Sequence, residues 1–329
     1  MNRRKANPAD RRTVTRRDAI GRVVATSATL AVTSHLGAIA MADPTTATAT
    51  EPSGAIDAHV HVWTHDTAKY PLSAGYRREE MAPPSFTPEQ LFEHMRPCGV
   101  NRVALVQMSF YGFDNSYMLD TIKRFPGVFS GIAVIDDAAD RPQDEMRRLK
   151  PLGVRGFRIY PRNMPVDRWL ETPGLAAMWE YGAAERMAMC CLVNPDALSA
   201  IDRMCEKHPD TPVVVDHCGR VGISGEIREE DLNQLCRLAR HKNTYVKVSA
   251  FYALGKKKSP YTDLAAMIRR LRDAFGAERL MWATDCPYQV QGDNTYRDSI
   301  ELVRSRLDFL TADDRQRLLQ KTAQRVFFS

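Results

Sequence analysis

The 329-residue sequence contains no Cys-x-x-Cys pair, although it has seven cysteines. That absence excludes a zinc ribbon, and the odd number with an adjacent Cys190-Cys191 pair indicates small core residues rather than a disulfide framework. Nowhere does the chain reach the run of about eighteen apolar residues that a membrane-spanning helix needs. We therefore expect no stable membrane span.

The sequence also lacks an excess of charge in its body, because the net charge of +6 is confined to the amino-terminal end. Residues 1–42 contain eight Lys/Arg and two Asp/Glu, which leaves 38 basic and 38 acidic residues from position 43 onward. A formally neutral body has no surplus of cations to neutralise phosphates. This balance argues against nucleic acid as a partner.

The basic amino-terminal segment has the pattern of an export signal. Thr15-Arg16-Arg17-Asp18 resembles the twin-arginine motif, and a mildly apolar run over 23–42 follows it. Ala40-Met41-Ala42 provides the small-x-small pattern of a cleavage site. We predict a twin-arginine signal peptide over 1–42, a linker rich in Thr, Ala and Pro over 43–53, and one domain over 54–329. The export machinery would then be a partner, and the mature protein would be periplasmic.

Eight short apolar runs alternate with amphipathic stretches from residue 54 onward. The runs are Ala55–Trp63, Arg102–Met108, Val128–Ile135, Val154–Tyr160, Met187–Val193, Pro212–His217, Tyr245–Phe251 and Leu280–Asp285. Helix-start signals such as Thr87-Pro88 and Thr172-Pro173 open the stretches between them. Eight such repeats predict an α/β fold, a (β/α)8 TIM barrel, with one extra C-terminal helix from Asp313 to Phe328. A doubly wound sheet would need a Gly-x-Gly-x-x-Gly turn after its first strand, and the sequence has none there.

Ionisable residues gather in the first run. Asp57, His59 and His61 follow one another at i, i+2 and i+4, so a regular strand would place all three on one face, pointing into the barrel mouth. Two imidazoles on one face can bind a divalent metal ion or hold a substrate oxygen. Buried imidazoles are costly unless they are paired, bound to metal or functional.

Three later runs end with further candidates for the same rim, because chemistry in such barrels lies at the carboxyl ends of the strands. His217 ends the sixth run and Asp285 the eighth. In the fourth run Arg158 faces the lumen if Gly156 does, and a guanidinium there suits a carboxylate or a developing oxyanion.

Three separated motifs occur in one order along the chain: 56–63 (IDAHVHVW), 215–219 (VDHCG) and 281–287 (MWATDCP). Together they resemble the amidohydrolase superfamily, in its amidohydrolase-2 branch. The segments 54–59, 107–109, 112–115 and 131–134 are in addition similar to the 2-pyrone-4,6-dicarboxylate lactonases and related sugar lactonases of that branch. The resemblance covers 54–329.

The resemblance implies a role for each matching residue. Asp285 would be the general base, while His59, His61 and His217 would bind a metal ion or hold the carbonyl. Arg158, Ser109 and Tyr160 would bind the substrate. That substrate would be a small molecule, a carboxylated lactone.

The cofactor stays open between one divalent ion, zinc or manganese, and none. A single ion would be held by His59, His61 and Asp285. A dinuclear site is not expected, because the fifth run, Met187–Val193, contains no histidine.

The resemblance favours opening of a lactone by attack of water that is activated by a general base or a metal ion. One alternative is a zinc-dependent decarboxylase of the same family. The other is a non-catalytic periplasmic protein that binds an anionic small molecule in the barrel mouth.

Overall fold

The computed structural model describes residues 54–161, 164–166 and 168–329. The predicted signal peptide over 1–42 and the linker over 43–53 lie outside these residues. The described residues belong to one compact unit. In this part of the chain, no helix has both the length and the apolar character that crossing a membrane requires.

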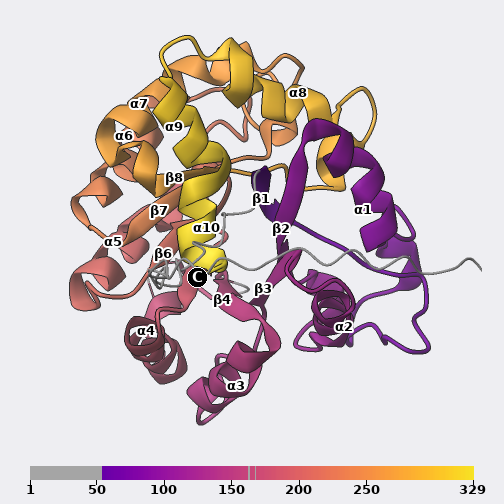
Figure 1. The fold of residues 1–329 in the computed structure, drawn as a ribbon. Coiled ribbons are helices and arrows are strands. Elements are labelled where there is room, and N and C mark those ends of the chain that lie inside the picture. Colours follow the sequence, from indigo (N-terminus) through magenta and orange to yellow (C-terminus); the bar gives the residue numbers. More distant parts are fainter. Residues whose placement is uncertain (1–53, 162–163, 167) are drawn as a thin grey trace, which may run out of the picture. The chain divides into compact units, whose positions relative to one another are not determined.

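Eight parallel strands follow one another in sheet order β1 to β8, as the eight apolar runs predict (Figure 1). They are β1 Ala55–Val60, β2 Val100–Val106, β3 Phe129–Ala133, β4 Val154–Ile159, β5 Ala188–Cys191, β6 Val213–Val215, β7 Thr244–Val248 and β8 Leu280–Trp282. Two backbone hydrogen bonds join β1 to the segment after β8, from His61 N to Cys286 O at 2.8 Å and from Asp285 N to His59 O at 2.9 Å. The predicted TIM barrel is confirmed.

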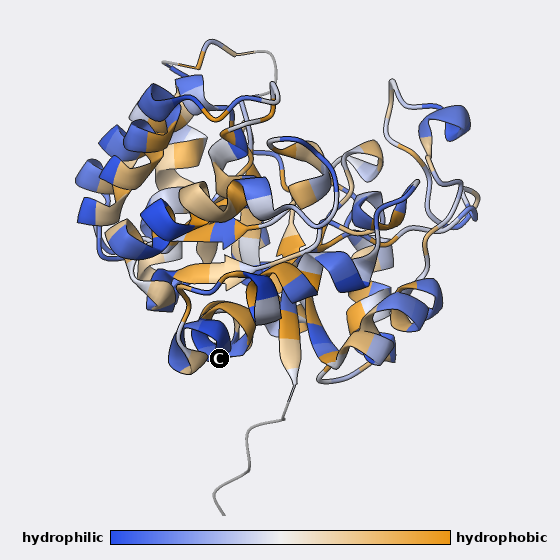
Figure 2. Cartoon of the chain, turned by 90° about the horizontal axis from the view of Figure 1, so that it is seen from above, coloured by the Kyte–Doolittle hydropathy of each residue, from blue (hydrophilic) through white to orange (hydrophobic). Residues whose placement is uncertain are grey.

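Helices surround the barrel (Figure 1). They are α1 Pro88–Met95, α2 Ser116–Arg124, α3 Pro142–Leu149, α4 Pro173–Glu185, α5 Leu198–Lys207, α6 Glu229–Arg237, α7 Ala265–Phe275, α8 Tyr296–Glu301, α9 Ala312–Gln316 and α10 Thr322–Phe327. The Thr87 and Thr172 side chains cap α1 and α4 by accepting hydrogen bonds from backbone N–H groups of the first turn. The helices turn apolar residues toward the strands and polar residues outward (Figure 2).

The predicted C-terminal helix is α9, a π-helical turn over Arg317–Lys321, and α10. Arg102 at the beginning of β2 hydrogen-bonds Gln324, and Arg325 lies against the Tyr245 ring at the beginning of β7. Helix α10 therefore covers the amino-terminal end of the barrel, opposite the expected site. Its Ala323 and Phe327 pack with apolar side chains from the barrel interior.

Candidate functional site

A β-bulge near the end of β1 decides which of its polar side chains enter the barrel. Asp57 pairs with Val103 and Val60 with Leu105, so β1 uses one more residue than β2 over this interval. An extra residue reverses the alternation of faces. The prediction that Asp57 shares one face with His59 and His61 is therefore wrong.

Asp57 instead accepts hydrogen bonds at the seam between β1 and β8. Thr284 Oγ1 donates to Asp57 Oδ2 at 2.5 Å, and Tyr296 Oη donates to the same oxygen at 2.7 Å. Burial raises the pKa of Asp57 to about 6, although these hydrogen bonds lower it. The role of Asp57 is to join the first strand to the last.

His59, His61 and Asp285 direct three atoms toward one point at the mouth. The two Nε2 atoms lie 3.3 Å apart, and Asp285 Oδ1 lies 3.5 Å from His59 Nε2 and 3.2 Å from His61 Nε2. All three residues are buried. Asp285 takes a left-handed backbone conformation, with φ +70°, a strained geometry of the kind that clusters at functional sites.

The second nitrogen of each ring shows how the imidazoles are oriented. His61 Nδ1 lies 2.7 Å from Val106 O, which only accepts hydrogen bonds, so Nδ1 carries the hydrogen and Nε2 a lone pair. His59 Nδ1 lies 3.4 Å from Asp216 Oδ1, an arrangement that likewise puts a lone pair on Nε2, and this lone pair accepts from Arg158 Nη2 at 2.6 Å. A tetrahedral zinc ion bound at about 2.0–2.1 Å would separate its ligand atoms by about 3.3 Å. The donor set of His59, His61 and Asp285 therefore fits one divalent cation.

A buried charged layer lies beneath this point. Lys247 Nζ is 3.0 Å from Asp216 Oδ1, and Arg158 Nη2 is 3.3 Å from Asp216 Oδ2 and 2.6 Å from His59 Nε2. Burial raises the pKa of Asp216, but Lys247, His59 and Arg158 outweigh it and hold the pKa well below its usual range. Burial and Lys247 lower the pKa of His59, so this ring is neutral.

Asp285 has two more partners at its other oxygen. Tyr252 Oη donates to Asp285 Oδ2 at 2.6 Å, and His217 Nε2 lies 3.8 Å from that atom. Burial acts to raise the pKa of Asp285, but His217, His61 and His59 hold it below its usual range. Asp285 is therefore an ionised carboxylate, the state that a general base requires.

His217 is oriented by Ser249, whose Oγ lies 2.9 Å from His217 Nδ1. Burial lowers the pKa of His217 to about 4, so the ring is neutral near pH 7. Burial and Asp285 raise the pKa of Tyr252, and they raise that of Tyr288 to about 12. Both phenols therefore remain hydrogen-bond donors.

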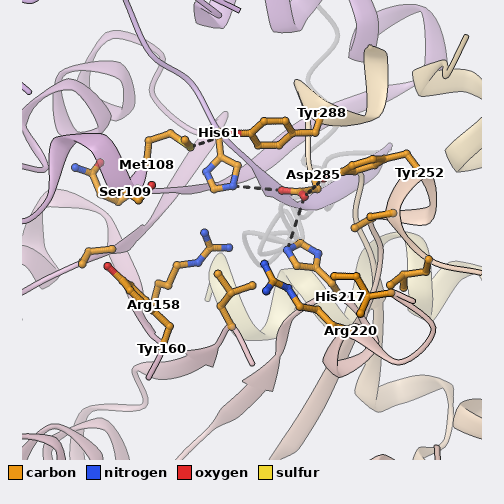
Figure 3. A pocket seen from close by; sticks show the side chains of 17 residues that line it. His61, Met108, Ser109, Arg158, Tyr160, His217, Arg220, Tyr252, Asp285 and Tyr288 are labelled. Carbon is orange, nitrogen blue, oxygen red and sulfur yellow. Dashed lines mark hydrogen bonds and ion pairs between the residues drawn. The ribbon is translucent and has the colours of Figure 1, made fainter. Parts of the chain in front are cut away.

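These groups open into a pocket of about 340 Å³ (Figure 3). A cavity of this size holds a small-ring compound. The three predicted substrate-binding residues, Arg158, Ser109 and Tyr160, all line it. The other lining residues are His61, Gln107, Met108, Val134, Leu192, His217, Arg220, Ile223, Ala250, Tyr252, Ala253, Leu254, Asp285 and Tyr288.

Three residues of the site, Lys247, Tyr252 and Arg220, were not predicted from the sequence patterns. A lysine flanked by Val246 and Val248 in an apolar run is the signal that could have identified Lys247 as a buried charge. Tyr252 and Arg220 follow strands β7 and β6 in loops, where no periodicity shows the direction of a side chain. Only the fold brings these two residues to the pocket.

Comparison with known proteins gives a match at three levels. The sequence profile of a family described as amidohydrolase matches residues 56–328. L-fucono-1,5-lactonase of Burkholderia ambifaria is 29% identical over 70% of this chain and 80% of its own. A 2-pyrone-4,6-dicarboxylate hydrolase of Comamonas testosteroni is 26% identical over 84% of this chain and 91% of its own. The crystal structure of a Burkholderia multivorans amidohydrolase with bound zinc superposes with a TM-score of 0.70 at 20% identity, over 84% of this chain and 99% of the other.

Proposed function

From the premise that the chain belongs to the amidohydrolase family, we propose that it is a hydrolase that opens a lactone or related cyclic ester by attack of water. The observation that carries the proposal is the convergence of His59, His61 and the ionised Asp285 at one point beside a small pocket, which His61 and Asp285 line. The relatives named as a lactonase and a 2-pyrone-4,6-dicarboxylate hydrolase support it.

In this reaction the oxygen of water forms a bond to the acyl carbon, and the bond from that carbon to the ring oxygen breaks. Asp285 accepts a proton from the attacking water, and Tyr252 keeps the carboxylate in place through its hydrogen bond to Oδ2. The leaving ring oxygen takes up a proton, and the product is a hydroxy acid.

The negative charge that develops on the carbonyl oxygen needs donors. Arg158 reaches the mouth beside His59, and His217 lines the same pocket. Arg158 presents N–H groups at a fixed position, because Asp216 holds its guanidinium, and Ser249 holds the His217 imidazole in place. A divalent ion held by His59, His61 and Asp285 would supply Lewis acidity and lower the pKa of water when bound.

The alternative, a zinc-dependent decarboxylase, is not supported, because the fifth strand has no histidine to bind a metal ion. The side chain that β5 places in the barrel interior is that of Cys190, which belongs to the apolar cluster there. Burial raises the pKa of this thiol to about 12, so it is protonated and a poor metal ligand. Hydrolysis is the reaction that the described residues favour.

The test is elemental analysis of protein purified without chelator, together with turnover of a small panel of five- and six-membered lactones before and after chelation. Stoichiometric zinc or manganese with chelator-sensitive turnover supports hydrolysis with a bound ion. Undiminished turnover without metal supports hydrolysis with Asp285 as a free base. A folded protein that opens none of the lactones in either state, with and without added zinc, would contradict the proposal.

We also propose that the protein is exported by the twin-arginine route. The support is the order of the arginine pair, apolar run and small-x-small pattern in residues 1–42. Replacing Arg16 and Arg17 with lysine in the full chain is expected to retain the protein inside the cell. Unchanged export of this variant, or export that continues in cells without the twin-arginine machinery, would contradict the proposal.

A further inference from the structure

Arg220 differs from the other cations of the site in having no carboxylate partner. Arg158 and Lys247 both contact Asp216. The Nη1 group of Arg220 donates to Asn194 Oδ1 at 3.3 Å, and no carboxylate of the described residues lies within ion-pair distance of it. Arg220 nevertheless lines the pocket that holds Asp285.

The backbone that carries Arg220 is strained. His217, Cys218, Gly219 and Arg220 have φ angles of 54°, 51°, 59° and 56°, so four consecutive residues are left-handed, and three of them are not glycine. Such a conformation costs roughly 1–2 kcal/mol for each residue with a Cβ atom. The turn directs both His217 and Arg220 into the same pocket, where Arg158 and Arg220 point their guanidinium groups toward the centre (Figure 3).

The two arginines therefore have different tasks. Arg158 already has protein partners, because its Nη2 contacts both Asp216 and His59 beneath the reacting centre. We infer that Arg220 binds a carboxylate substituent of the substrate, while Arg158 serves the carbonyl that reacts. This inference rests on the proposed function and assigns Arg220 as the residue that selects lactones with a carboxylate substituent.

The surroundings of Arg220 strengthen such an interaction. The exposed Ile223 and the buried Leu254 line the same pocket with apolar side chains, and a charge pair is stronger beside apolar walls than in water. Gly255 N donates to Gly222 O at 2.9 Å and so joins the loop after β7 to the loop after β6. The loop after β7 continues into the exposed lysines 256–258, whose charges make the electrostatic potential more positive.

The first test measures binding with ring compounds that cannot be hydrolysed. Tetrahydropyran-2-carboxylate and its primary amide have the same shape and differ in charge, and calorimetry gives their dissociation constants. We expect the wild type to bind the carboxylate at least roughly 10-fold more tightly than the amide, Arg220→Gln to lose this preference, and Arg220→Lys to keep part of it. The matched control is Arg237→Gln, at an exposed arginine on α6, which should behave as the wild type. Equal binding of both compounds by the wild type, or a preference that persists in Arg220→Gln, would overturn the inference.

The second test separates the inference from the proposed function. For a lactone with a carboxylate substituent, Arg220→Gln should raise KM roughly 10- to 100-fold and change kcat by less than about threefold. For the amide of the same lactone, neither constant should change. Equal losses on both lactones would show a purely structural role and overturn the inference. A wild type that binds the carboxylate through Arg220 but opens neither lactone would instead support the subsite and reject lactone hydrolysis.

Discussion

The two ends of the barrel interior have opposite chemistry. At the amino-terminal end, Phe327 and Ala323 of α10 pack with Ile56, Ala104 and Met281 from the strands, and all of these side chains are apolar and buried. At the mouth, His59, Asp216, Lys247 and Asp285 are also buried and Arg158 is partly buried, but these side chains are polar or charged. The side chains at both ends are largely buried, so the difference lies in how each group of side chains offsets the loss of hydration.

The apolar end gains free energy from burial itself, and loses it when a side chain is truncated. The charged end gains little, because desolvation of ions costs about as much as their pairing returns. It is stable only while every charge keeps its partner. We therefore expect substitutions at the mouth to lower activity, or to lower stability by leaving a buried charge without its partner. Substitutions at the apolar end should lower the free energy of unfolding and leave activity largely unchanged.

The largest expected effect is that of Asp285→Asn. The amide keeps the shape but cannot accept a proton from water, so kcat/KM on any lactone that the wild type opens should fall roughly 10²- to 10⁴-fold. The free energy of unfolding should change little. Steady-state kinetics and thermal unfolding measure the two quantities, and Asp293→Asn at an exposed loop position is the control. Full turnover in a folded Asp285→Asn protein would exclude Asp285 as the base.

Lys247→Met is expected to lower the free energy of unfolding by about 3 to 5 kcal/mol, because it removes the closest cation from the buried Asp216 carboxylate. The double variant Lys247→Met, Asp216→Asn should regain most of this stability without regaining activity. Urea unfolding measures both. Lys242→Met, at an exposed lysine just before β7, is the control. Equal stability of Lys247→Met and the wild type would show that the charged layer is not held by pairing.

Phe327→Ala tests the apolar end and should lower the free energy of unfolding by about 3 kcal/mol, because it leaves a cavity beneath the strands. The value of kcat should remain within about twofold of the wild type, because the Phe327 ring touches the charged layer only at Lys247 Nζ, 5.2 Å from the ring centroid, and lies at the opposite end from Asp285. Phe328→Ala, at a half-buried ring, should cost less. A fall in kcat that exceeds the loss of folded protein would show that the two ends are coupled.

The smallest effect is expected at the rim. Replacing Lys256 and Lys258 with serine removes two exposed charges, which salt screens effectively. The value of kcat/KM for a carboxylated lactone should fall less than about threefold at low salt, and the difference should vanish at about 0.5 M salt. A larger loss that persists at high salt would place these lysines in direct contact with the substrate.

The sequence predicted the barrel well, because its evidence is local and repeated. The alternation of apolar runs and amphipathic stretches gives β1 to β8 in order, and the Thr87 and Thr172 caps start helices at the expected places. His59, His61, His217, Asp285 and Arg158 could be grouped for the same reason, since the carboxyl ends of parallel strands meet at one mouth.

Other parts of the site could not be read in this way. The extra residue between Asp57 and Val60 reverses a face of β1, and nothing in the spacing of the sequence marks it. A buried strand can hold the charged Lys247 only because Asp216, at the end of the neighbouring strand β6, lies 3.0 Å from its Nζ. Arg220 reaches the pocket through a left-handed turn that side-chain preferences argue against.

The sequence by itself determined the number and order of the β–α units and the identity of the polar residues at the strand ends. These properties follow from backbone periodicity and from parallel strand direction, which neighbouring residues control. Only the tertiary structure decided which nitrogen of each imidazole faces Asp285, which cation Asp216 holds, and which arginine remains without a carboxylate. Each of those depends on contacts between residues tens to hundreds of positions apart, for which the linear pattern carries no signal.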